Sequence, residues 1–556
     1  MVGSRVREPD PEMRMATSRK VVILGVDGAD PGYYRKWMDA GLTPNFARLA
    51  ARGRMGILQS TYPPVTAPAW TSFMTGEQPG SHGIVGFSAP STGEYARKVV
   101  NSGSIESPLL WEIAGDRGAD CIVVNVPLTY PLRRMNGVLV AGMLTPDGVG
   151  FTWPKEFEAE LKLIQPDYQI DLLWQDYQDR GIDLVRDQKE MTRARAELCV
   201  KLLESRPWDL FTVVFTGTDR IQHCLHEHVE KIHDESAVRK DTLTAAVRDY
   251  FVSLDDWVGD IMKAAGEDTH FIVMSDHGFG RVEQSVYFNR WLADAGFLSL
   301  RTGEAKRLQG MKRVLNAVGI RRSTLSAAGR AVGLGAKVDA QVEKLNPFTG
   351  GIHWDRTRAY YYPTNGFFVN LQGREMFGTV KPGAEYEQVR DDLIAALEAL
   401  KDPRTGGRLI PVVRRREELF AGRNMERLPD VFIEFMDQPF DAFLQNYDHP
   451  EVFYDPGWMN GTHRRNGLYI GAGPELAEGA EVEDLEIFDI APNVLHLLGQ
   501  SIPEHMDGRL RQDLFAEPAR RDPQYEPVLD SMDRREGITS EEEKELEERL
   551  KGLGYL

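Results

Sequence analysis

The chain has 556 residues, a length that suits one large α/β domain with insertions or two to three domains. Its formal net charge of -18 at pH 7 argues against a nucleic-acid binder, because an acidic surface repels the phosphate backbone. An anionic small-molecule substrate stays compatible with this charge, since bound metal ions can reverse the local field inside a cleft.

Three widely spaced cysteines, Cys121, Cys199 and Cys224, form neither a disulfide framework nor a CxxC metal site. The first twenty residues are charged and lack an apolar segment typical of a signal peptide. A membrane-spanning helix needs roughly 20 apolar residues, and the sequence contains no such run. We therefore expect a cytoplasmic protein without a transmembrane segment, and we leave open whether it forms a homo-oligomer.

Short apolar runs rich in β-branched residues alternate with helical patterns along the chain. Because the runs are continuous rather than alternating, they predict buried strands of a mostly parallel sheet. The predicted strands are 21–26, 121–124, 138–141, 210–215, 271–274, 367–371, 431–435 and 468–470, and helices are predicted at 43–52, 385–400 and 489–498. This alternation predicts a doubly wound α/β fold, with helices on both faces of the sheet.

Composition divides the chain into a core, an insertion and a tail. We expect residues 20–288 and 351–512 to form the catalytic core, 289–350 a helical cap insertion, and 513–556 a tail with a terminal helix. The insertion is rich in Lys and Arg and poor in acids, which favours a solvated cap over a basic lid for anionic substrates or membranes. In the tail, Thr539 and Glu542 form a capping-box pattern that predicts the start of the last helix.

Carboxylates and imidazoles follow several of the predicted strands. In an open parallel sheet, the loops after the carboxyl ends of the strands form the ligand crevice. Such a mixture of oxygen and nitrogen ligands suits two divalent metal ions, Zn²⁺ first and Mn²⁺ as the alternative. The alternative that each residue only caps a turn or lies on the surface is weak for a set of this size. The candidate ligands are Asp27, Asp219, His223, Asp276, His277 and His463.

Thr66 is the candidate nucleophile. It precedes Pro68, a residue favoured in the first turn of a helix, so its hydroxyl is expected at a helix N-terminus. The positive end of the helix dipole stabilises an alkoxide or a bound phosphate there. A threonine hydroxyl is a weak nucleophile at neutral pH, and metal coordination would activate it. Taken alone, Thr66 would be interpreted as a helix cap.

The order of these residues resembles the alkaline phosphatase superfamily, in particular the type I phosphodiesterase/nucleotide pyrophosphatase family. Residues 63–68 (PPVTAP) are similar to the family motif P-x-x-T-x-P, which carries the nucleophile. Residues 75–83 (TGEQPGSHG) are similar to the motif T-G-x-x-P-x-x-H-G that follows it, in which His82 is expected to have a structural role in a turn. The resemblance covers roughly residues 20–280 and 355–509.

The resemblance implies two metal sites and a covalent mechanism. Asp219, His223 and His463 would hold one ion, whereas Asp27, Asp276, His277 and the Thr66 oxygen would hold the other. Thr66 would attack phosphorus and form a phospho-threonine intermediate that water releases. The implied substrate is a small phosphoester, such as a nucleotide, a lipid head group or a sugar phosphate.

One position departs from the family pattern. Nucleotide pyrophosphatases of this family place an Asn beside the phosphate, and Phe87 stands at that position here. Asn365 and the backbone N–H of Ala67 are the candidate replacement donors. We therefore expect a phosphodiesterase or nucleotide pyrophosphatase, with a phosphomonoesterase or phosphomutase as the alternative.

Two further alternatives share the fold. A sulfatase needs a Cys or Ser followed by P-x-R, and the sequence from Thr66 to Trp70 (TAPAW) lacks both the modifiable residue and the arginine. A catalytically silent binding protein would be expected to have lost part of the ligand set, which is complete here.

Overall fold

A computed structural model describes residues 19–90, 97–301, 351–362, 366–436, 438–443, 451–527 and 538–552. These residues build a nine-stranded central sheet in the order β20-β2-β19-β9-β1-β8-β5-β6-β7. Its strands are β1 (Val21–Val26), β2 (Gly53–Gln59), β5 (Cys121–Val124), β6 (Gly137–Val140), β7 (Thr152–Trp153), β8 (Leu210–Phe215), β9 (His270–Met274), β19 (Asn466–Ala472) and β20 (Val482–Glu486).

Parallel strands form the middle of this sheet. β1 pairs in parallel with both β8 and β9, and β5 pairs in parallel with β8 and β6. Every residue of β1, β5, β8 and β9 is buried, as expected for strands that are covered on both faces. β19 and β7 run antiparallel to their neighbours, so the sheet is mixed but mostly parallel, as predicted.

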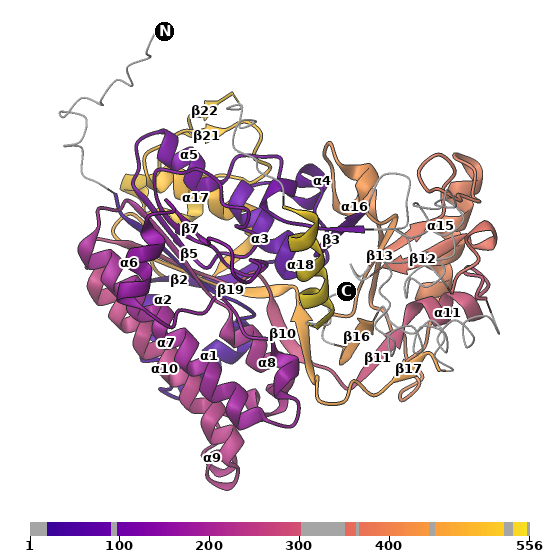
Figure 1. Cartoon of the computed structure of the whole chain (residues 1–556), viewed down its shortest axis with the longest axis horizontal. Helices are drawn as coiled ribbons and strands as arrows, with labels where there is room; N and C mark the ends of the chain where they lie inside the picture. The colour runs from indigo at the N-terminus through magenta and orange to yellow at the C-terminus, as the bar shows by residue number, and fades with distance from the viewer. Residues whose placement is uncertain are drawn as a thin grey trace.

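Helices cover both faces of the sheet, which confirms the doubly wound fold (Figure 1). One layer consists of α1 (Pro31–Asp39), α2 (Pro44–Ala51), α7 (Gly181–Ser205) and α10 (Thr242–Ala265). The opposite layer consists of α3 (Thr66–Thr75), α5 (Leu110–Asp116) and α17 (Ile490–Leu497). All ten residues of α3 are buried, because this helix lies between the sheet and α17.

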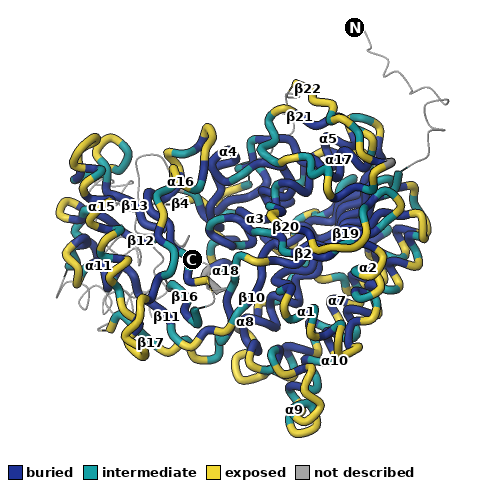
Figure 2. Tube along the Cα trace, turned by 180° about the vertical axis from the view of Figure 1, so that it is seen from behind, coloured by how far each residue is buried: buried dark blue, intermediate teal, exposed yellow. Residues whose placement is uncertain are grey.

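A second, smaller sheet lies beside the central one. β12 (Ala359–Tyr362), β13 (Gly366–Val369), β15 (Val431–Glu434) and β14 (Val412–Arg415) form an antiparallel sheet in this order. It shares its own hydrophobic core with α11 (Phe288–Asp294) and α15 (Ala384–Ala399), apart from the core of the central sheet (Figure 2).

This second sheet corrects part of the strand prediction. Segments 367–371 and 431–435 are strands, but they belong to the antiparallel sheet and not to the central parallel one. Their continuous apolar runs arise because this sheet is also packed on its faces, and burial alone does not reveal strand direction. Most of the predicted cap insertion, residues 302–350, lies outside the described residues, so its helical character stays a prediction.

The last helix, α18 (Ser540–Gly552), packs against the part of the chain that contains the central sheet (Figure 1). The predicted capping box is present, because Glu542 N donates to Thr539 Oγ1 and Thr539 N donates to the Glu542 carboxylate. Leu546 and Leu550 are fully buried in the main hydrophobic core. Tyr130 also donates a hydrogen bond of 2.6 Å to Glu542, so both apolar and polar contacts fix the helix.

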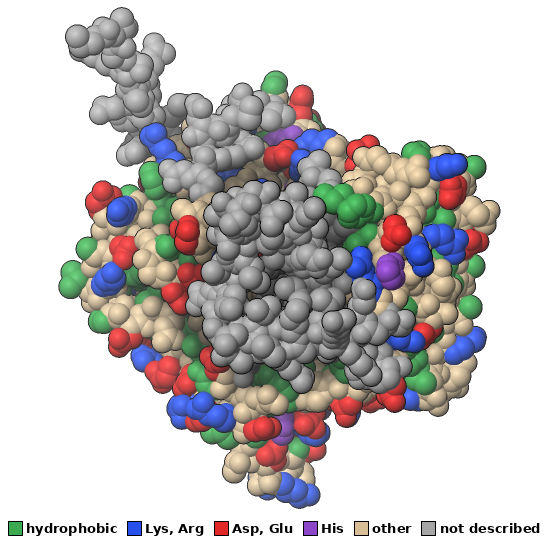
Figure 3. All heavy atoms as spheres, turned by 45° about the vertical axis from the view of Figure 1, so that its right-hand side comes forward, with side chains coloured by type: hydrophobic (Ala, Val, Ile, Leu, Met, Phe, Trp, Pro, Cys, Tyr) green, Lys and Arg blue, Asp and Glu red, His purple; other side chains and the backbone are tan. Residues whose placement is uncertain are grey.

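The surface and the helices carry two further findings. On the face drawn in Figure 3, acidic and basic side chains of the described residues lie interspersed. Among the described residues, no helix is long and apolar enough to cross a membrane. The cytoplasmic location stays a prediction.

We expect that Leu550→Ala weakens the attachment of α18. The substitution removes a fully buried side chain and leaves a cavity, a change that costs about 2–5 kcal/mol. Amide hydrogen exchange of α18, followed by mass spectrometry, should become correspondingly faster. Lys544→Ala, on the exposed side of the same helix, is the control and should leave the exchange unchanged. Equal exchange in the two variants would show that Leu550 does not fix the helix.

Candidate metal centre and nucleophile

The predicted ligands lie close together because β1, β8 and β9 end at the same edge of the central sheet. In the parallel register Val26 lies beside Phe215, and Gly25 lies beside Met274. Asp27 follows β1 directly, Asp276 and His277 follow β9, and Asp219 lies in the first turn of α8 (Gly217–Val229) after β8. All of these side chains are therefore delivered to the carboxyl edge of the sheet.

His463 reaches this edge from a different direction. It lies on β18 (Gly461–Arg464), which pairs with β10 (Gly278–Arg281) immediately after His277. In this short antiparallel pair His463 stands opposite Phe279. This pairing of β10 with β18 therefore brings His463, from a distant part of the chain, to the ends of β8 and β9.

Asp219, His223 and His463 form the first group. His223 Nε2 lies 3.3 Å from Asp219 Oδ1, and His463 Nε2 lies 3.2 Å from the same oxygen. The two imidazole Nε2 atoms are 2.9 Å apart. Asp219 and His223 share one face of α8 because they are four residues apart on a helix.

Asp27, Asp276 and His277 form the second group. His277 Nε2 lies 3.2 Å from Asp276 Oδ2 and 3.6 Å from Asp27 Oδ1. The three ligand atoms lie within 4.8 Å of one another, which is compact enough to hold one ion. His277 also lies within this limit of Asp219 and His463, and its ring stacks on His463 at 3.6 Å, so the two groups are adjacent.

All three histidines are oriented by backbone carbonyls. The Nδ1 atoms of His223, His277 and His463 lie 3.0–3.1 Å from the carbonyl oxygens of Gly461, Gly278 and Pro64. A carbonyl only accepts, so each Nδ1 carries the proton and each Nε2 directs a lone pair toward the carboxylates. Such outer hydrogen bonds commonly fix metal-binding histidines.

Thr66 lies at a helix start that contacts both groups through neighbouring residues. It is the first residue of α3 and is almost fully buried. Two residues before it, the Pro64 carbonyl contacts His463 of the first group. One turn after it, Trp70 Nε1 lies 3.4 Å from Asp27 Oδ2 of the second group. The α3 N-terminus is thus tied to both groups.

Gly25 lets α3 approach the sheet this closely. A Cβ atom at Gly25 would lie 2.6 Å from the Trp70 ring and 2.8 Å from Val214. A larger residue at position 25 of β1 would therefore displace Trp70, whose indole contacts Asp27.

Four buried polar atoms of this region have no hydrogen-bond partner among the described residues. They are Asp27 Oδ1, Thr66 Oγ1, Asp276 Oδ2 and His277 Nε2. Buried polar atoms are nearly always hydrogen-bonded, so a group of unpaired acceptors suits a bound cation. These atoms are those that the resemblance assigns to the second ion, and the residues present therefore fit a divalent metal.

Burial and repulsion shift the acidity of the carboxyl groups. Burial raises the pKa of Asp276 to about 7, and the negative charge of Asp219 adds to this rise. Burial likewise raises the pKa of Asp27 well above its ordinary value, with repulsion from Asp276 and Asp219 as the next causes. Asp219 differs: burial opposes its ionisation, but His223, His463 and Arg220 together hold its pKa well below the usual range.

Burial also favours the neutral form of two of the imidazoles. It lowers the pKa of His277 well below its ordinary value, and His463 lowers it further. The pKa of His223 is lowered mainly for the same reason. Neutral imidazoles beside carboxylates are the protonation states that metal ligands require.

The sequence analysis missed the residues that support this site. Arg220 directly follows Asp219 and pairs with it, and with Asp171, in the protein interior. Trp174 packs edge-on against His223 at 4.3 Å. The position of Arg220 inside the segment TDRIQH was a signal, but nothing in the sequence placed Asp171 or Trp174 near it.

Three further predicted positions have different outcomes. His82 is buried, with Nε2 2.9 Å from Ser72 Oγ and Nδ1 accepting from Ile84 N, so it supports a turn as expected. Phe87 is buried in the main core, and that position supplies no side-chain donor. Asn365 lies outside the described residues, so its role as a phosphate donor stays a prediction.

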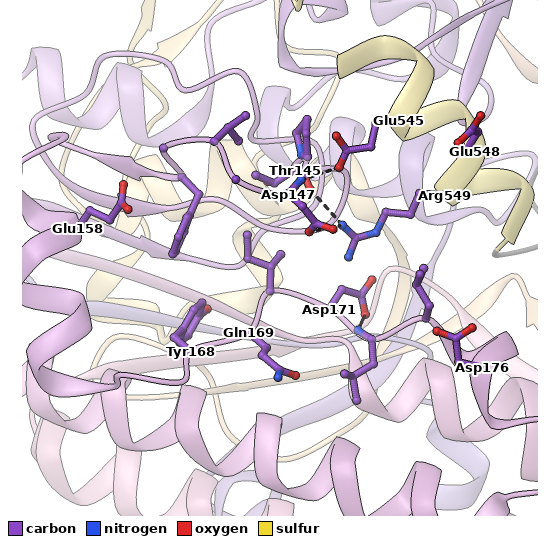
Figure 4. A pocket seen from close by; sticks show the side chains of 18 of the residues that line it. Thr145, Asp147, Glu158, Tyr168, Gln169, Asp171, Asp176, Glu545, Glu548 and Arg549 are labelled. Atoms are coloured by element: carbon purple, nitrogen blue, oxygen red, sulfur yellow. Dashed lines mark hydrogen bonds and ion pairs between the residues drawn. The ribbon is translucent and has the colours of Figure 1, made fainter. Parts of the chain in front are cut away.

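A pocket of about 950 Å³ has Asp171 in its wall (Figure 4). Residues 145–151, the segment 168–177 and α18 line it. Arg549 projects from α18 between Asp147 and Asp171 in this view, and it donates to the Thr145 carbonyl. Asp171 connects the pocket wall to Arg220, and through it to Asp219.

Comparison with known proteins identifies the family. Residues 21–463 match the sequence profile of the type I phosphodiesterase/nucleotide pyrophosphatase family. The chain belongs to this family. It is accordingly a phosphodiesterase/nucleotide pyrophosphatase-like hydrolase, which removes the sulfatase and the silent binding protein from the alternatives. A search of curated proteins gave no match.

Two solved structures are similar to this chain. Phosphonoacetate hydrolase from Sinorhizobium meliloti 1021, in complex with phosphonoacetate, has a TM-score of 0.53 at 15% identity, covering 86% of this chain and 96% of that chain. Murine ectonucleotide pyrophosphatase/phosphodiesterase 5 has a TM-score of 0.47 at 14% identity, covering 90% of this chain and 100% of that chain. The first likeness confirms the alkaline-phosphatase-like fold of this phosphodiesterase family member.

We expect Asp276→Asn to stabilise the metal-free protein at pH 8 but not at pH 4.5. An acid with a raised folded-state pKa stabilises the fold below its unfolded pKa, and this stability is lost as pH rises through about 7. The amide avoids this loss, which is on the order of 1–3 kcal/mol, since one pKa unit corresponds to about 1.4 kcal/mol.

Thermal unfolding of chelator-treated protein at the two pH values measures this difference. Asp260→Asn, on the surface-exposed end of α10, controls for the general effect of removing a carboxylate. A metal-free Asp276→Asn protein that is less stable than the parent at pH 8 would contradict the prediction.

Proposed function

We propose that the protein hydrolyses small phosphodiesters or nucleotide pyrophosphate bonds with two divalent metal ions and Thr66 as the nucleophile. The observation that carries this proposal is the buried Thr66 Oγ1, which has no hydrogen-bond partner among the described residues and lies at a helix start whose neighbours Pro64 and Trp70 contact His463 and Asp27. A buried hydroxyl left unpaired between these contacts suits an activated nucleophile better than a helix cap. No cap hydrogen bond from a side chain is formed at the start of α3, which supports this choice.

The ligand groups assign a place to each ion. Asp219, His223 and His463 would hold the first ion, and the second would lie among the Asp27, Asp276 and His277 side chains and Thr66 Oγ1. When bound, the ions would supply positive charge that favours the Thr66 alkoxide and offsets charge on the phosphoryl oxygens. The three-His, three-Asp set favours Zn²⁺, with Mn²⁺ as the alternative.

Thr66 would then act on phosphorus in two steps. Its Oγ1 gives up its proton to solvent and forms a bond to phosphorus while the bond to the leaving-group oxygen breaks; the leaving group takes a proton from solvent, and a phospho-threonine remains. Water attacks the same phosphorus from the opposite side, and Thr66 regains its hydroxyl proton. The N-terminus of α3 directs N–H groups, including that of Ala67, toward the phosphoryl oxygens and stabilises their charge.

The substrate is a small phosphoester. Nucleotides, lipid head groups and sugar phosphates all meet this description, and the family favours a diester. The second candidate is a phosphomonoesterase, because buried Phe87 supplies no amide donor where nucleotide pyrophosphatases of this family have one.

We expect Thr66→Ala to lower kcat by at least about 10³-fold, because it removes the nucleophile but few of the metal ligands. The variant should keep most of its bound metal, measured by elemental analysis. Thr75→Ala is the matched control, since Thr75 is a buried threonine of the same helix whose hydroxyl donates to the Thr71 carbonyl. Full activity in Thr66→Ala would refute the nucleophile assignment.

We expect the Zn²⁺- or Mn²⁺-loaded protein to cleave bis-p-nitrophenyl phosphate faster than p-nitrophenyl phosphate. The comparison of kcat/KM for the two compounds decides between diester and monoester specificity, because they share one leaving group. The opposite preference would establish the phosphomonoesterase alternative. Removal of metal by a chelator should abolish both activities, and added Zn²⁺ or Mn²⁺ should restore them.

A further inference from the structure

Arg220 is a positively charged side chain that pairs with the candidate metal ligand Asp219, and it is buried. Its side chain is 1% exposed. Burying a guanidinium costs free energy unless its hydrogen bonds are satisfied. The partners of Arg220 therefore indicate which groups it positions. These partners are Asp219 and Asp171.

The two oxygens of the Asp219 carboxylate have different partners. Arg220 Nη1 donates to Asp219 Oδ2, whereas the two histidine Nε2 atoms face Oδ1. The guanidinium therefore occupies one oxygen and leaves the other directed into the first ligand group. The side chain also fixes the rotation of the carboxylate, because a planar donor imposes the plane of its partner.

Asp171 holds Arg220 from the opposite side. Arg220 Nη2 donates to Asp171 Oδ2 at 2.7 Å and Nε donates to Oδ1 at 3.2 Å, a bidentate arrangement. The segment that carries Asp171 is itself pinned, because buried Arg195 donates to the carbonyls of Ile170 and Val214. Asp171 is thus tied to the end of β8, the strand that precedes Asp219.

The same guanidinium also supports the imidazole of the first group. Arg220 lies over the Trp174 ring at 5.3 Å, and Trp174 packs edge-on against His223 at 4.3 Å. Two of the three candidate ligands of the first ion therefore depend on the position of Arg220. Arg220 acts on the second group through its charge on Asp27, which is one of the smaller influences on that carboxyl and lowers its pKa.

We propose that Arg220, held by Asp171, is a positioning residue that presents Asp219 Oδ1 to the first metal ion and through this geometry sets the affinity of that site. This inference rests on the proposed two-metal function. Asp171 neutralises the Arg220 charge, so the pair orients Asp219 without repelling a cation.

Metal titration of chelator-treated protein in the absence of substrate tests this proposal. We expect Arg220→Lys, which keeps the charge but loses the planar fork, to weaken one of two Zn²⁺ sites about 10–100-fold, as outer-shell changes commonly do. The other site should keep its affinity. High Zn²⁺ concentrations should restore much of the lost kcat, because the reacting groups remain in place.

Arg133→Lys is the matched control. Arg133 forms an equally buried bidentate pair with Glu112, with 2% and 0% exposed side chains, away from the ligand groups. Both variants should lower the thermal midpoint, but only Arg220→Lys should change metal affinity. Equal Zn²⁺ affinity in the parent and Arg220→Lys would show that the Arg220 pair is only structural.

Asp171→Asn provides a second variant in case Arg220→Lys does not fold. It retains the shape of the side chain and leaves the full Arg220 charge on Asp219, so the same single site should weaken. Unchanged affinity in this variant would also overturn the proposal. A parent protein that binds no divalent ion at all would instead contradict the proposed function, so the two failures can be told apart.

Discussion

The burial of three carboxylates within contact distance of shared imidazoles is the constraint on which the site depends. Asp27, Asp219 and Asp276 are each no more than 1% exposed. Burial opposes the ionisation of such groups and like charges repel one another, and both effects raise the pKa values of Asp27 and Asp276. The fold therefore stores an electrostatic cost that protons offset at low pH and that cations would offset at neutral pH.

The central sheet keeps these carboxylates close together because its strands are rigid and end at the same edge. The apolar residues of β1, β8 and β9 pack on both faces, and their register leaves no freedom for the residues that follow. α3 is enclosed just as tightly, with Gly25 allowing Trp70 to reach Asp27. The hydrophobic core thus holds polar groups in an arrangement that they would not adopt by themselves.

The sequence predicted the central sheet, its two helical layers and the meeting of the candidate ligands, because all of these follow from local patterns. Apolar runs identify buried strands, and a polar residue directly after a strand lies at a known edge. The antiparallel sheet that contains residues 367–369 was not predicted, since a buried run does not encode its direction. Asp171 and Trp174 were missed because their contacts with Arg220 and His223 depend on how a loop crosses the sheet edge.

The buried charges also bear on how many ions the site needs. Asp27, Asp171, Asp219 and Asp276 carry four negative charges when ionised, and Arg220 is the described cation in contact with them. The resulting three negative charges would repel a phosphate ester, and one divalent ion would still leave the centre negative. Two divalent ions would make it positive by one charge, which attracts an anionic substrate and then balances the charge that develops on its oxygens. A chain with a net charge of -18 can thus act on anions, provided that both ligand groups are filled.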